Sequence, residues 1–231
     1  MPPAIYVAGD TAGAPAGASE LELLTPSTTR AGDTMLAIVV THVDVEVEVG
    51  DEWTILADLT TPEDGRITIL RRPARDGDAS SVSLPFAGGS AVERSIAALL
   101  ILRGVDPHAE LVASDAVDVS GAQEFPCPSL ELAAYSDLYL GIVAAISDET
   151  TFAQPSDARL LIEGDGDGMT IAVFGRWPET PGPTGTQEAT AALEVAGVAA
   201  AIALSADALR GLGKSFAFDP PGAIGLPTEG V

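Results

Sequence analysis

The stretch THVDVEVEV, from Thr41 to Val49, indicates the fold class most clearly. Its valines, at every second position from Val43 on, alternate with acidic side chains. A period of two is typical of a β-strand, whose successive side chains point to opposite faces. The pattern therefore predicts a strand over residues 41–49, with the valines buried and the acidic side chains in water.

Other segments share this strand character. Residues 34–40 are continuously apolar and follow a turn at residues 31–33. The 24 glycines and 17 prolines are spread along the chain and divide it into short segments at the spacing of strands and turns. Roughly a dozen short strands with one-sided alternation predict an all-β fold, namely an antiparallel two-sheet β-sandwich of jelly-roll-like form.

We expect residues 1–210 to form a single β-sandwich domain, because all-β domains of this size often fold as one unit. Residues 211–231 contain five glycines and three prolines, and Phe216 and Phe218 are their only aromatic residues. This composition predicts an extended, irregular C-terminal arm. Two interpretations stay open: the arm docks on a neighbouring subunit through the two phenylalanines, or it packs on its own domain.

Two segments combine helix formers with strand character. In the alanine-rich residues 189–210, Gly197 interrupts the run, and we expect a hairpin of two strands there with a short helix at residues 206–210. Residues 90–102 are expected to open with a helical turn at residues 91–94 and to continue as a strand.

The chain carries 11 Lys and Arg against 34 Asp and Glu, a formal net charge of −23. Such a field opposes binding to nucleic acid and to anionic membranes, which need a cationic surface. Apolar residues make up 46% of the chain, enough to build a core. Lys214 is the only lysine and asparagine is absent, which indicates a GC-rich genome, with a halophilic source as the alternative.

Residues 1–10 have neither the basic nor the apolar region of a secretory signal, and no apolar run has the length of a membrane span. We therefore expect synthesis in the host cytoplasm. No pattern predicts catalysis either, because His42 and His108 stand in unrelated contexts and Cys127, between two prolines, has the setting of a packed, inert thiol. The expectation is a protein that is not an enzyme and needs no cofactor.

The strongest candidate for a metal site is the run from Glu163 to Gly168, in which Glu163, Asp165 and Asp167 alternate with glycines. Alternating carboxylates can surround Ca²⁺, although this run lacks the distal glutamate of an EF-hand. The alternative is a polar hairpin tip, because Asp-Gly is a preferred two-residue turn. We favour the hairpin and keep calcium as the second hypothesis.

Aromatic residues offer a candidate ligand face. Trp177, Tyr135 and Tyr139 would line a shallow sugar site if they were exposed beside polar side chains. Trp53 lies in the apolar run Trp53 to Leu56, where a core position is expected.

The order of several segments resembles a β-sandwich module of bacteriophage virions. The shared features are the strand start at Gly32-Asp33, the Trp53-Thr54 segment and the turn Arg103-Gly104-Val105-Asp106-Pro107, in which Gly104 permits a positive φ. The resemblance extends over about residues 3–206. Modules of this type occur in minor tail proteins, fibres and other surface proteins of phages.

The resemblance implies a structural protein of the virion, either a minor tail protein or a capsid-decoration protein, without catalytic residues. Its partners would be other virion proteins, and it would form a homo-oligomer or a many-copy assembly. An acidic surface is compatible with such an assembly, because it limits adhesion to DNA and between copies. The alternative function is a carbohydrate-binding or host-adhesion module built on the same sandwich.

Overall fold

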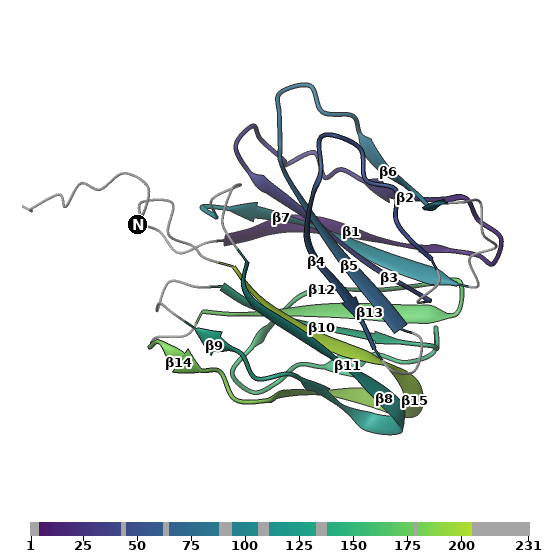
Figure 1. Cartoon of the computed structure of the whole chain (residues 1–231), viewed down its shortest axis with the longest axis vertical. Helices are drawn as coiled ribbons and strands as arrows, with labels where there is room; N and C mark the ends of the chain where they lie inside the picture. The colour runs from purple at the N-terminus through teal and green to yellow at the C-terminus, as the bar shows by residue number, and fades with distance from the viewer. Residues whose placement is uncertain are drawn as a thin grey trace, which may run out of the picture.

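The computed structural model describes residues 5–42, 45–61, 65–87, 94–105, 111–132, 138–177 and 180–204. Within these residues the chain forms two main antiparallel sheets (Figure 1). The strands of the first sheet are, in spatial order, β1 (Ile5–Ala14), β7 (Ser95–Arg103), β3 (Thr34–His42), β5 (Gly65–Pro73) and β4 (Thr54–Thr60).

The second sheet is built from the C-terminal half of the chain. Its main strands are β12 (Arg159–Gly166), β13 (Met169–Arg176), β10 (Leu138–Ala145) and β15 (Gln187–Leu204), in that spatial order. Two further strands, β8 (Leu111–Cys127) and β11 (Phe152–Ala153), pair with β15. Two small ribbons complete the described strands: β2 (Glu20–Leu24) with β6 (Ser81–Pro85), and β9 (Glu131–Leu132) with β14 (Gly182–Pro183).

The predicted all-β antiparallel sandwich is confirmed. The chain completes the first sheet before it starts the second. This path was not part of the predicted jelly-roll-like form. The residues that the structure describes contain no α-helix, and therefore no helix of the length and apolarity that crossing a membrane requires.

Three apolar layers hold the molecule together. The first lies between the two sheets, where side chains such as Ile38 and Leu100 face Ile142 and Ile202. The second covers the outer face of the first sheet with the β2–β6 ribbon and Trp53. The third covers the outer face of the second sheet with residues of β8, β9 and β11. The central strands are therefore buried on both faces, which explains why they are continuously apolar.

The stretch from Thr41 to Val49 differs from the prediction. Strand β3 ends at His42, and of the described residues 45–49 only Val47 forms a β-bridge, an isolated one with Phe86. Val45 and Val47 are nevertheless buried in the second apolar layer, while Glu46 and Glu48 are exposed. The predicted alternation of burial is correct at residues 45–48, but the prediction of one sheet strand over residues 41–49 is wrong. This segment crosses the outer face of the sheet and no longer pairs within it.

The alanine-rich segment also differs from the prediction. Residues 187–204 form one strand, β15, and the predicted break into a hairpin at Gly197 is wrong. A Cβ atom at Gly197 would lie 2.9 Å from the Cα atom of Ala145. Gly197 therefore lets β10 and β15 approach closely, and the pairing of β15 with β8 shifts register at Val195, beside it. The expected helical elements at residues 91–94 and 206–210 fall wholly or mostly outside the described residues.

Candidate functional site

The run from Glu163 to Gly168 forms a hairpin, as predicted. Strands β12 and β13 are joined by Asp167 and Gly168, whose φ angles are 52° and 80°. Positive φ at both central residues is typical of the type I′ turn, which Asp-Gly favours.

The glycines of this run have a packing role at the edge of the sandwich. Gly166 lies against Gly13 of β1, where a Cβ atom on Gly13 would lie 2.5 Å from the Gly166 carbonyl carbon. A Cβ atom on Gly164 would overlap the side chain of Thr11. Side chains alternate along a strand, so Glu163 and Asp165 point away from β1. The alternation of acid and glycine therefore follows from the contact between the edge strands of the two sheets.

The structure does not bring Glu163, Asp165 and Asp167 together as ligands. The Glu163 carboxylate accepts a hydrogen bond from the backbone N–H of Phe152 at 2.6 Å. Asp165 and Asp167 are exposed. Among the described residues, no group of three or more His, Cys, Asp or Glu could hold a metal ion.

The candidate ligand face is not assembled as predicted. Tyr139 is buried in the third apolar layer and its hydroxyl donates to the carbonyl of Pro128 at 3.1 Å, so the prediction of an exposed Tyr139 is wrong. Its position in β10, a strand buried on both faces, is the reason. Tyr135, Phe216, Phe218 and His108 lie outside the described residues.

Trp177 borders a hollow of about 740 Å³ at one end of the sandwich. The hollow is also lined by Asp157 and Arg176, which form an ion pair at 3.0 Å, and Arg176 donates to the carbonyl of Thr184 at 2.8 Å. The indole packs on the core between the sheets, and its Nε1 is enclosed without a hydrogen-bond partner. Of the three proposed aromatic residues, Trp177 alone lies in the described part and beside a hollow.

One of the bidentate ion pairs among the described residues has a clear structural role. Arg103, at the end of β7, donates two hydrogen bonds to the Asp33 carboxylate, at 2.8 and 2.7 Å. Burial opposes ionisation of Asp33, but the bonds from Arg103 and the backbone N–H of Arg30 outweigh it and lower its pKa. Gly104 follows with φ 79°, as predicted for this turn. The pair therefore ties the end of β7 to the start of β3.

The buried titratable groups are poor candidates for chemistry at neutral pH. Burial raises the pKa of the Cys127 thiol to about 12. Burial also raises the pKa of Tyr139. A thiol acts as a nucleophile in its thiolate form, which is scarce at such a pKa. The predicted inert character of Cys127 agrees with its burial within the third apolar layer.

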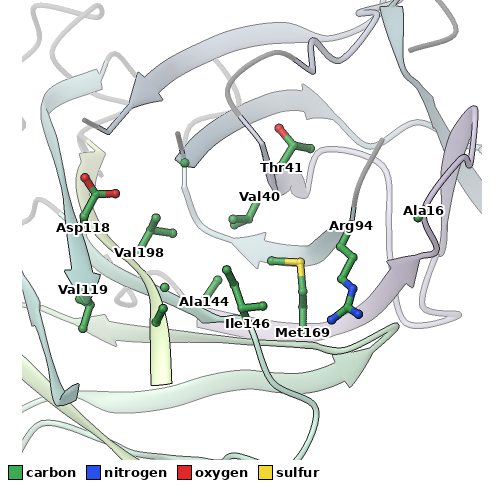
Figure 2. A pocket seen from close by; sticks show the side chains of 13 residues that line it. Ala16, Val40, Thr41, Arg94, Asp118, Val119, Ala144, Ile146, Met169 and Val198 are labelled. Atoms are coloured by element: carbon green, nitrogen blue, oxygen red, sulfur yellow. The ribbon is translucent and has the colours of Figure 1, made fainter. Parts of the chain in front are cut away.

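A second cavity opens between the two sheets, at the end of the sandwich opposite to Trp177. We call it the mouth; its volume is about 610 Å³. Its walls are apolar, formed by Val40, Ala144, Met169 and Val198, and Ile146 stands beside them with 59% of its surface exposed. Figure 2 shows Asp118 and Arg94 on opposite sides of these apolar residues.

The mouth was not predicted from the sequence, because its residues come from β3, β5, β8, β10, β13 and β15 and form no motif. The two glycines among these residues gave no signal either. A Cβ atom at Gly65 would lie 2.6 Å from the Val198 side chain and one at Gly197 would lie 2.9 Å from Ala145, so both are sites of close packing and not of open space.

Comparisons of the chain with protein-family models, curated proteins and solved structures gave no match.

Proposed function

We propose that this chain is a structural component of a tailed-phage virion, a minor tail or capsid-decoration protein that mediates contacts between subunits. The sequence resemblance to virion β-sandwich modules supports this proposal. In this role the sandwich acts as a rigid body, and its surface chemistry decides where neighbours attach.

One observation carries the proposal: the mouth is an apolar hollow on the surface of a chain with a net charge of −23. The half-exposed Ile146 extends the apolar surface beyond the hollow itself. An apolar patch rimmed by polar side chains is typical of a contact surface between proteins. A neighbouring subunit that covered the mouth would remove this apolar surface from water.

The distribution of charge supports the same proposal. Four of the arginines are paired with aspartates of the same chain, in the pairs Arg66–Asp58, Arg72–Asp78, Arg103–Asp33 and Arg176–Asp157. The remaining surface is strongly acidic, and copies repel one another over most of it. Contacts between copies are therefore restricted to places where apolar or compensated groups interrupt the acidity.

The proposal is tested on the phage whose genome carries this sequence. Virions purified by density gradient and analysed by quantitative mass spectrometry should contain the protein at a fixed ratio to the major capsid protein. A phage with an amber codon in this gene should yield particles that lack it and are either incomplete or less stable. Wild-type virions without the protein would refute the proposal.

Sugar binding is the alternative, and the specific observation that favours it is Trp177 beside a polar hollow with Asp157 and Arg176. The burial of Tyr139 weakens this alternative, since the predicted face loses one of its three aromatic residues. A glycan array probed with the whole chain, with Trp177→Ala as the comparison, distinguishes the two functions. Binding that the variant loses would favour adhesion.

A further inference from the structure

We propose that the mouth of one copy receives the segment Lys214 to Asp219 of the next copy, with Phe216 and Phe218 inserted between the two sheets. This inference rests on the proposed function, because it identifies the contact through which subunits join. It assigns a partner to the mouth, namely a second copy of this chain.

The course of β15 places the mouth and the end of this strand at opposite ends of the sandwich. Gly197 of β15 lines the mouth and pairs with Ala145. The same strand ends at Leu204, which pairs with Leu138 at the far end of β10. Seven residues separate Gly197 from Leu204, a distance of about 23 Å along a strand. A copy stacked in line on this end therefore presents its mouth to the chain that follows Leu204.

The length of the intervening chain is sufficient. Phe216 follows Leu204 by twelve residues, which span at most about 40 Å when extended. The segment can therefore cross a subunit boundary and enter the neighbouring sandwich without any change in the strands that hold the mouth open.

The apolar chemistry of the segment fits the mouth. Phe216 and Phe218 are two residues apart, so in an extended segment both side chains point to the same side. The cavity of about 610 Å³ has room for two aromatic rings, whose burial is a large source of contact energy. Met169 in its wall has an unbranched, adaptable side chain that contacts aromatic rings favourably.

A charge flanking the phenylalanines complements one at the mouth. Lys214 precedes them and Asp219 follows them. At the mouth, Asp118 and Arg94 lie on opposite sides of the apolar walls (Figure 2). Docking with Asp219 near Arg94 places opposite charges together at one end of the segment. Such complementarity sets the direction of the segment and selects this contact among acidic surfaces that otherwise repel.

The test compares the full chain with the double variant Phe216→Ser/Phe218→Ser by sedimentation equilibrium. The control is Ile224→Ser/Leu226→Ser, which removes two apolar side chains from the same C-terminal region. The wild type and the control should self-associate equally, and the Phe216/Phe218 variant should associate about 100-fold more weakly, since two buried aromatic side chains are lost. Equal association of all three proteins, or a wild type that stays monomeric up to about 1 mM, would overturn the inference.

Charge exchange tests the direction of docking and shows whether it occurs between copies. Arg94→Asp and Asp219→Arg should each weaken association by about tenfold, and the two changes in one chain should restore it. A mixture of Arg94→Asp chains with Phe216→Ser/Phe218→Ser chains should form dimers, because the first supplies an intact segment and the second an intact mouth. Failure of either rescue would overturn the inference.

The same double variant, introduced into the phage, separates this inference from the proposed function. Wild-type virions that contain the protein, together with variant virions that lack it, support both. Equal incorporation of the variant overturns the docking contact and leaves the proposed function standing. Absence of the wild-type protein from virions refutes the proposed function, whatever the chain does in solution.

Discussion

The contact between the edge strands β1 and β12 gives the sharpest prediction about stability. Gly13→Ala adds a Cβ atom 2.5 Å from the carbonyl carbon and 2.6 Å from the carbonyl oxygen of Gly166. These atoms belong to the backbone and cannot rotate away, so one sheet edge must move. Overpacking of this kind costs about 1–3 kcal/mol. For a chain of this length, that lowers the Tm by about 2–12 °C.

The control for Gly13→Ala is the same substitution at a glycine with open space. Around Gly50 no atom lies within 4 Å of the added Cβ, and its φ is not positive. Gly50→Ala should therefore leave the Tm unchanged or raise it slightly, because alanine restricts the unfolded chain. The assay is differential scanning calorimetry of the two variants and the wild type in one buffer.

The rival hypothesis of a calcium loop is tested in the same series. Asp165→Asn removes a charge from the exposed face of β12, where we expect a change in stability of no more than about 0.5 kcal/mol. Calcium and EGTA should leave the Tm of the wild type unchanged. A Gly13→Ala variant as stable as Gly50→Ala, or a Tm that rises with calcium only while Asp165 is intact, would refute the packing explanation.

Three further predictions follow from the buried polar groups. Asp33→Asn should cost about 1–3 kcal/mol at pH 7, because it leaves Arg103 without its carboxylate. Because the pKa of Asp33 is lower in the folded than in the unfolded protein, its carboxylate stabilises the fold above the unfolded-state pKa, which is near 4, and this stabilisation is lost as the pH falls through the folded-state pKa. In urea titrations the free energies of unfolding of the variant and the wild type should therefore converge in acid. A difference that stays constant with pH would contradict this explanation. Cys127 should not react with DTNB at pH 8 in the folded protein and should react fully in guanidinium, whereas rapid native labelling would show an exposed thiol. Tyr139→Phe should lower the free energy of unfolding by about 1 kcal/mol, because the carbonyl of Pro128 loses its buried donor; an unchanged value would contradict that hydrogen bond.

The fold class could be predicted from the sequence, because strand periodicity and turn residues are local signals. The turn at Asp167-Gly168 and the positive φ of Gly104 were predicted for the same reason. The alternation at residues 45–48 correctly predicted which side chains are buried. It could not show that this segment crosses a sheet, since a segment packed on the outer face has the same pattern of burial as a paired strand.

The sequence was misleading at glycines whose role depends on residues in a distant part of the chain. Gly197 looked like a turn residue, but it is explained by the close approach of Ala145 in another strand. Gly164 and Gly166 also suited the second hypothesis of a calcium loop beside the favoured hairpin, but their packing against β1, some 150 residues earlier in the sequence, explains them. The mouth combines side chains from five strands, and a single sequence contains no signal for such a combination.

A cryo-electron microscopy map of the virion decides whether this chain is part of the particle. The map should contain repeated density into which the two-sheet sandwich fits, with the mouth of each copy covered by a neighbouring subunit. Particles without such density, with the protein recovered only outside them, would contradict the claim that this chain is a structural part of the virion.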